Sequence, residues 1–346
     1  MNKITALDVN WCGRPKSIAA ALLESGNHAA LIDPGPESTL TTLREQLRRH
    51  GLAISDLDAI LITHIHLDHA GATGSLVREN PKLKIYVHAN GARHMVDPSK
   101  LLASAGRLWG DQLSVLFGET LPVPEGNLQV LEGGETLALG SRKLEVAYTP
   151  GHASHHVSYF DAYEGAAFIG DTGGIRIDNG PYILPATPPP DIDLTLWDQS
   201  FKTILDRRPT RLFLTHFAWS NDPAAHLVEF RDRLHHWLAT AEKSLDAAAA
   251  SVAAHQAPNS ASTKSPADTD AEKKAAIRET EAKIEAVAMN DFIKECRAEM
   301  DARLGPIEAE HHAFTAGLDL SFRGLARALR KRQEATTAAP SAARSN

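Results

Sequence analysis

The stretch HIHLDH, residues 64–69, directly follows the apolar residues 59–62, which have the length and character of a buried strand. In an extended chain, side chains two residues apart face the same side, so His64 and His66 can point together at one ion. The glycine-bearing turn that follows redirects the chain, so Asp68 and His69 can reach a second ion nearby. This stretch therefore predicts one half of a metal site at the end of a strand.

Three more apolar runs are each followed by a residue of the kind that binds metals. These residues are His152 after 144–148, Asp171 after 166–169 and His216 after 212–214. If the strands lie side by side, their ends bring five imidazoles and two carboxylates into one cleft. Such donors suit zinc, and also iron or manganese, while the lack of cysteine donors argues against a closed structural zinc site. We predict two bound divalent metal ions, with zinc as the first candidate.

The two carboxylates of this set have predicted catalytic roles. Two cations roughly 3.5–4 Å apart need an anionic bridge, and Asp171 is the natural candidate because one carboxylate offers two oxygens. A hydroxide can also bridge the ions, since metal-bound water is acidified to a pKa of about 7 and needs no serine or cysteine nucleophile. Asp68 can orient this nucleophile or manage its proton. The chain is therefore predicted to be a metal-dependent hydrolase.

The order of these residues resembles the metallo-β-lactamase superfamily, in particular its glyoxalase II-like hydrolases. The resemblance covers residues 1–240 and implies an α/β (α+β) fold, a four-layer αββα sandwich with the metals at one edge. It implies a first metal held by His64, His66 and His152, a second held by Asp68, His69 and His216, and Asp171 shared by both. The family's early aspartate turn resembles Asp33-Pro34-Gly35, where Asp33 would orient a ligand. The other interpretation of Asp33 is a simple turn former.

Departures from related families narrow the predicted chemistry. Zinc β-lactamases of the commonest type have a cysteine where Asp171 stands, and flavodiiron oxygen reductases have a glutamate where His66 stands. Sulfur dioxygenases of this fold use a single iron, which the complete second set of donors disfavours. The resemblance favours hydrolysis of a thioester, ester or lactone, and so a small-molecule substrate. The alternative is a phosphodiesterase or nuclease of the same superfamily, for which the same two-metal arrangement would serve.

Other histidines and prolines near this pattern have more ordinary interpretations. His155 and His156 follow His152 closely, and packing or support of a ligand is expected of them rather than direct metal binding. His88 and His94 are expected to be core or surface residues. The prolines at 185 and 188–190 form either a lid over the cleft or a rigid connection to the helix expected at 194–205.

The composition along the chain predicts three parts. Residues 1–240 read as the catalytic domain and include a predicted hairpin of 17–23 with 29–32. A capped amphipathic helix is expected from Leu40, after Ser38 and Thr39. Residues 245–275 are rich in Ala, Ser, Thr, Pro, Lys and Asp, which predicts a disordered linker.

A helical appendage is expected at 276–335, in two helical segments at 276–304 and 307–333. Its candidate apolar contacts are Ile277, Ile284, Val287, Phe292 and Ile293. The basic run 327–332 is expected to be a solvated helix end, with contact to an anionic partner as the alternative. The appendage could also serve for oligomerisation or docking.

Size and charge limit the remaining classes of protein. The chain has 346 residues with 43% hydrophobic content, enough for a substantial core. Its net charge of −7 argues weakly against a broad nucleic-acid-binding face. No apolar stretch is long enough for a membrane span, and we expect no signal peptide. Cys12 and Cys296 lie far apart and indicate no disulfide framework, so we expect a cytoplasmic protein.

Overall fold

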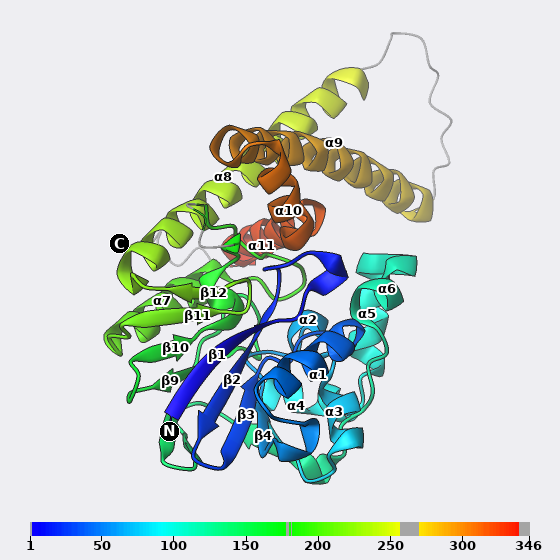
Figure 1. Ribbon diagram of the computed structural model, residues 1–346. Coiled ribbons are helices and arrows are strands. Elements are labelled where there is room, and N and C mark those ends of the chain that lie inside the picture. The colour runs from blue at the N-terminus through cyan, green and yellow to red at the C-terminus, as the bar shows by residue number, and fades with distance from the viewer. Residues whose placement is uncertain (1, 178–179, 181, 257–269, 339–346) are drawn as a thin grey trace, which may run out of the picture. The chain divides into compact units, whose positions relative to one another are not determined.

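The computed structural model describes residues 2–177, 180, 182–256 and 270–338, which form two compact units. The first unit ends at Arg231 and leaves out the segment Thr187–Ile192. That segment belongs with the chain from Asp232 onward, in the second unit. The strands of both sheets lie in the first unit (Figure 1).

The first sheet is six-stranded, in the order β1-β2-β3-β4-β5-β6. Its strands are β1 (Asn2–Asp8), β2 (Ala19–Ser25), β3 (His28–Ile32), β4 (Ala59–Leu61), β5 (Lys84–His88) and β6 (Leu128–Leu131). β1, β2 and β3 pair antiparallel, and β3 to β6 pair parallel. The predicted hairpin is confirmed, because Leu22 of β2 pairs with Leu31 of β3. Both strands are largely buried, as expected of strands covered on two faces.

The second sheet is also six-stranded, in the order β12-β11-β10-β9-β8-β7. Its strands are β7 (Thr136–Leu139), β8 (Arg142–Tyr148), β9 (Val157–Asp161), β10 (Ala166–Phe168), β11 (Arg211–Leu214) and β12 (Ala218–Ser220). Only β10 and β11 pair parallel within it. A parallel pair needs a crossover connection, and α7 (Leu194–Asp206) lies between these two strands in the chain.

One hydrophobic cluster joins the inner faces of the two sheets. It contains Leu23 and Ile32 from the first sheet and Val146, Phe168 and Phe213 from the second, all at most 2% exposed. Helices lie beside both sheets, with α1, α3 and α4 by the first and α7 by the second (Figure 1). The predicted αββα sandwich is therefore confirmed.

Six α-helices lie between β3 and β6 in the described chain. They are α1 (Leu40–Arg49), α2 (Leu67–Ala70), α3 (Thr73–Glu79), α4 (Ala89–Val96), α5 (Ser99–Trp109) and α6 (Leu113–Phe117). α1 buries Leu40, Leu43 and Leu47 on one face, as predicted. The predicted cap differs, because the Thr39 hydroxyl donates a hydrogen bond to the carbonyl of Pro36 instead of accepting one from the helix.

The second unit is helical and has a core of its own. It comprises Thr187–Ile192, the later part of α8 (Pro223–Gln256), α9 (Asp270–Leu304), α10 (Pro306–Ala316) and α11 (Leu318–Ala338). Phe292 of α9 lies at the centre of this core, with its ring centroid 5.5 Å from those of Trp237 and Phe322. The predicted helix at 307–333 is two helices, because Gly317 adopts the left-handed conformation that ends α10.

One expectation about the linker and one about the appendage were wrong in part. The predicted linker, 245–275, is helical from 245 to 256 and from 270 to 275, and residues 257–269 lie outside the described residues. Alanine is the strongest helix former, so the alanines at 247–250 continue α8. Ile277 and Val287, predicted as apolar contacts, are 57% and 41% exposed.

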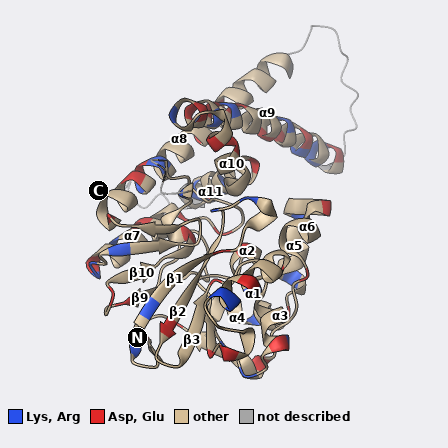
Figure 2. Cartoon of the chain, in the orientation of Figure 1, with Lys and Arg blue, Asp and Glu red and all other residues tan. Residues whose placement is uncertain are grey.

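Charged residues of both signs alternate along α9 (Figure 2). Pairs such as Lys283 with Glu279 and Arg297 with Asp301 join oppositely charged residues four apart. Within the described ranges of the chain, every helix falls short of the combination of length and apolar character that a membrane span requires.

Candidate metal centre

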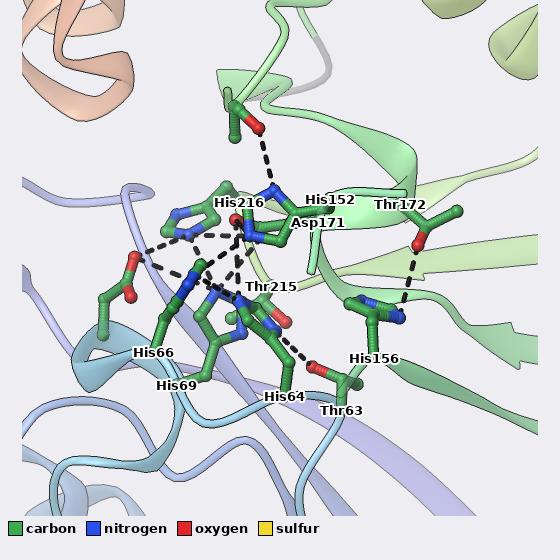
Figure 3. A network of polar contacts seen from close by, with 12 residues as sticks. Thr63, His64, His66, His69, His152, His156, Asp171, Thr172, Thr215 and His216 are labelled. Carbon is green, nitrogen blue, oxygen red and sulfur yellow. Dashed lines mark hydrogen bonds and ion pairs between the residues drawn. The ribbon is translucent and has the colours of Figure 1, made fainter. Parts of the chain in front are cut away.

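The predicted metal ligands follow strand ends of both sheets. His64 and His66 lie in the turn after β4, and His66 stands immediately before α2, which carries Asp68 and His69. The others follow β8, β10 and β11 of the second sheet: His152, Asp171 and His216. All seven side chains come together at one edge of the sandwich, as the sequence predicts (Figure 3).

Three imidazoles form a first group. The Nδ1 atom of His66 lies 3.0 Å from the Nε2 atom of His64 and 3.0 Å from the Nε2 atom of His152. The ring centroids of His64 and His152 are 4.8 Å apart. The three rings thus direct one nitrogen each toward a common point (Figure 3).

A second group contains two imidazoles and one carboxylate. The Nε2 atoms of His69 and His216 are 3.3 Å apart. The Oδ2 atom of Asp68 lies 3.3 Å from His216 Nε2 and 3.8 Å from His69 Nε2. This group matches the second set that the family resemblance implies.

Asp171 faces both groups with separate oxygens. Its Oδ2 atom lies 3.5 Å from His152 Nε2 and 4.0 Å from His64 Nε2. Its Oδ1 atom lies 3.1 Å from His69 Nε2 and 3.6 Å from His216 Nε2. Oδ1 is buried without a well-formed hydrogen bond within the described chain. A carboxylate in this position can bridge two cations.

Hydrogen bonds from the outer nitrogens of three imidazoles fix which ring nitrogen carries the proton. Nδ1 of His152 donates to the carbonyl of Ala186, at 2.8 Å, and Nδ1 of His216 donates to the carbonyl of Ser17, at 2.8 Å. Nδ1 of His69 donates to the Asp33 carboxylate at 2.9 Å. Each inner Nε2 atom therefore presents a lone pair to the centre.

His64 follows the same rule through a hydroxyl. The Thr63 hydroxyl donates to Asp33, so it can only accept the bond from His64 Nδ1, at 3.1 Å. His66 Nδ1 lies between His64 Nε2 and His152 Nε2, and it can carry at most one proton to share with them. Buried lone pairs that converge in this way repel one another unless a cation lies among them. The donor set therefore fits metal ions in both groups.

Charge in the two groups differs. Burial lowers the pKa of His66 to about 4 and holds the pKa of His64 well below its ordinary value, so both imidazoles are neutral. Burial alone would also lower the pKa of His69, but Asp171 and Asp68, with Asp33, raise it well above the ordinary value. Three carboxylates around His69 favour positive charge at this point, whether it is a proton or a metal ion.

Asp33 organises the centre from behind. Its carboxylate is fully buried and accepts hydrogen bonds from Thr63 N (2.8 Å), the Thr63 hydroxyl (2.7 Å), the Thr215 hydroxyl (2.8 Å) and His69 Nδ1. These bonds join the ends of β3, β4 and β11. Asp33 thus contacts a predicted ligand directly, and its side chain is more than a local turn former.

His155 and His156 lie next to the centre without joining either group. His156 Nδ1 lies 3.0 Å from the Thr149 hydroxyl and 3.3 Å from the Thr172 hydroxyl, which connects the loops that carry His152 and Asp171. His155 Nδ1 accepts a hydrogen bond from Ile65 N at 3.4 Å. Both side chains have the supporting positions expected of them.

Sequence reasoning missed the hydroxyls and carbonyls that hold the histidines. Thr63 and Thr215 each stand directly before a predicted ligand, and this repeated Thr-His pair was the available signal. The carbonyls of Ser17 and Ala186 have no signal of this kind, because every residue carries one.

This sandwich, with two groups of imidazole and carboxylate donors at one edge, belongs to the metallo-β-lactamase superfamily. The superfamily's sequence profile matches residues 13–216. A metallo-β-lactamase fold-containing protein of Sulfurisphaera tokodaii is 31% identical over 166 residues, which are 47% of this chain and 61% of that protein. A hydroxyacylglutathione hydrolase of Aeromonas hydrophila is 30% identical over 151 residues, 44% of each chain. The matches therefore span less than two thirds of these relatives.

A solved structure agrees with the fold. The crystal structure of an archaeal metallo-β-lactamase superfamily protein from Sulfolobus tokodaii superposes with a TM-score of 0.56 and 19% identity. The superposition covers 83% of this chain and 98% of the other. At this identity the likeness concerns the fold alone.

Proposed function

We propose that the chain is a metal-dependent hydrolase with a two-ion centre that cleaves a thioester, ester or lactone. The observation that carries the proposal is Asp171, whose two oxygens face two separate groups of metal-type donors. When bound, two such cations acidify a water and polarise a carbonyl, which supplies a nucleophile and oxyanion stabilisation at neutral pH. Zinc is the first candidate, with iron and manganese as alternatives for this donor set.

Asp68 lies at a more exposed side of the centre than His64 and Asp171 do. Its side chain is 25% exposed, whereas those of His64 and Asp171 are 0% and 5% exposed. A carboxylate at the open side of the centre can orient an attacking water or take up its proton. Asp171, deeper in the site, would keep the two positive charges together.

The thioester class is supported by the relative from Aeromonas hydrophila, whose name gives an acylated glutathione as its substrate. The basic run 327–332 gives the nuclease alternative little support. Arg327 and Lys331 donate to the carbonyl of Pro190, and Arg330 pairs with Glu285, so these cations have partners within the second unit. A small-molecule substrate is therefore the better proposal.

Turnover of a substrate panel tests the proposal. The full chain, loaded with zinc, iron or manganese, is assayed on thioesters, lactones and phosphodiesters. We expect hydrolysis of at least one thioester or lactone, and loss of that turnover in Asp171→Ala. Hydrolysis of phosphodiesters alone would replace the proposed substrate class. A chain that is inert with each ion would refute the hydrolase assignment.

A further inference from the structure

The short segment Thr187–Ile192 leaves the first unit and returns to it within a few residues. It belongs with the second unit, although Ala186 before it and Asp193 after it belong to the first. Three consecutive prolines, 188–190, lie within it. Proline fixes φ, so such a segment is stiff and transmits a displacement of one end to the other.

Both flanks of this segment contact the loop that carries His152. The carbonyl of Ala186 accepts the hydrogen bond from His152 Nδ1 at 2.8 Å. The backbone N–H of Asp193 donates to the carbonyl of Gly151 at 2.9 Å. Because the bond from Nδ1 decides that Nε2 presents its lone pair, the place of the Ala186 carbonyl sets the orientation of a predicted metal ligand.

Within the second unit, α11 holds the segment at several points. The Thr187 hydroxyl, fully buried, donates to the carbonyl of Ser321 at 3.2 Å. Arg327 Nε and Lys331 Nζ both donate to the carbonyl of Pro190, at 3.2 and 3.1 Å. A Cβ atom on Gly324 would overlap the carbonyl oxygen of Thr187, so the helix approaches the segment at a glycine.

We propose that α11 positions the metal ligand His152 through the segment Thr187–Ile192, with Gly324, Arg327 and Lys331 as positioning residues. This inference rests on the proposed metal centre and adds a C-terminal support to it. The basic run of α11 then serves to hold the carbonyl of Pro190, and the prolines connect this point of the chain to Ala186, whose carbonyl accepts the bond from His152.

Cobalt binding to the full chain tests the inference, with Co²⁺ as the probe and its visible absorption as the signal. In Arg327→Met with Lys331→Met, the donors to Pro190 are lost and the apolar stems are kept. We expect one of the two cobalt affinities to fall about tenfold, as for other residues that support a ligand, with an altered spectrum. The other affinity should stay within about twofold.

Matched variants distinguish positioning from general loss of stability. Arg330→Met removes a cation from the same helix that pairs with Glu285 instead, and both affinities should be unchanged. Exchange of the two cations, Arg327→Lys with Lys331→Arg, should restore the weakened affinity. Gly324→Ala should reproduce the defect by another route. The melting temperature of each metal-free variant is measured in parallel.

Two results would overturn the inference while leaving the metal centre intact. One is a double Met variant with both cobalt affinities within about twofold of those of Arg330→Met. The other is equal weakening of both affinities together with a lower melting temperature of the metal-free protein, which indicates general destabilisation. Failure of the wild-type chain to bind cobalt would instead refute the proposed metal centre, and the inference with it.

Discussion

Replacing Asp33 by Asn removes a buried charge that four donors share. Oδ2 accepts from the Thr63 hydroxyl, the Thr215 hydroxyl and His69 Nδ1, while Oδ1 accepts from Thr63 N. An amide can keep its oxygen on the side of the three donors, but its NH₂ group then faces the Thr63 N–H. The change therefore loses one buried hydrogen bond and weakens the others.

The expected cost follows from these contacts. Leaving one buried donor unsatisfied costs about 1–3 kcal/mol, and hydrogen bonds to a charged acceptor are stronger than those to a neutral one. We expect the free energy of unfolding of the metal-free protein to fall by about 2–4 kcal/mol. Zinc affinity should fall about 10–100-fold, because a neutral amide oxygen holds the proton on His69 Nδ1 less firmly than the carboxylate does.

Chemical denaturation and zinc competition against a chelator measure the two effects of Asp33→Asn. Asp58→Asn is the matched control, since that side chain is 48% exposed and pairs with His28 at the surface. The control should change unfolding by at most about 0.5 kcal/mol. An Asp33→Asn protein with stability and zinc affinity equal to the control would refute the argument that Asp33 organises the centre.

Three further predictions concern side chains outside the set of metal donors. Arg142→Met leaves the buried Asp161 carboxylate without its cation and should lower the free energy of unfolding by about 3–5 kcal/mol. Adding Asp161→Leu should recover most of this loss, and equal stability of the single and double variants would contradict the argument. Burial lowers the pKa of His226 to about 4, below its ordinary 6.5, so the unfolded chain binds the proton first and stability should decline as pH falls from about 6.5 toward 4. His226→Gln should flatten this decline in urea titrations, and an unchanged slope would count against the assignment. A thiol reagent should modify the exposed Cys12 in the folded chain and the buried Cys296, whose pKa burial raises, only on unfolding; two thiols reacting at equal rates would contradict the packing.

The centre itself was predictable because each donor follows an apolar run. Strands of one sheet edge end close together, so His152, Asp171 and His216 had to meet if their strands were neighbours, and β8 to β11 are neighbours. Alternation along the chain and the turn after His66 separate His64 and His66 from Asp68 and His69. The assignment of His152, Asp171 and His216 to these two groups could not be derived from spacing, and the sequence prediction took it from the family resemblance.

The main-chain carbonyls that support the centre were not predictable. Ser17 lies 199 residues before His216 and contacts it through a main-chain carbonyl, which leaves no trace in residue type. Ala186 is equally unremarkable as a residue. The composition also gave a wrong prediction at the start of the linker. The alanines there were predicted to belong to a disordered segment, but alanine favours helix, and α8 continues to Gln256.

The sequence also does not determine which face of α9 is buried. Ala288, Phe292, Cys296 and Met300 repeat every four residues and are at most 2% exposed. Of these four, only Phe292 was predicted as an apolar contact, and Ile277 and Val287, also predicted, lie on the exposed side. Apolar residues occur around this helix, so only the packing against its neighbours decides which face is buried.

Anomalous X-ray scattering at the zinc edge, from crystals of the full chain grown with zinc, tests the two-ion centre most directly. We predict two peaks about 3.5–4 Å apart. One should lie among His64, His66 and His152, the other among Asp68, His69 and His216, with Asp171 contacting both. A single peak at saturating zinc, or peaks away from these side chains, would contradict the proposed centre.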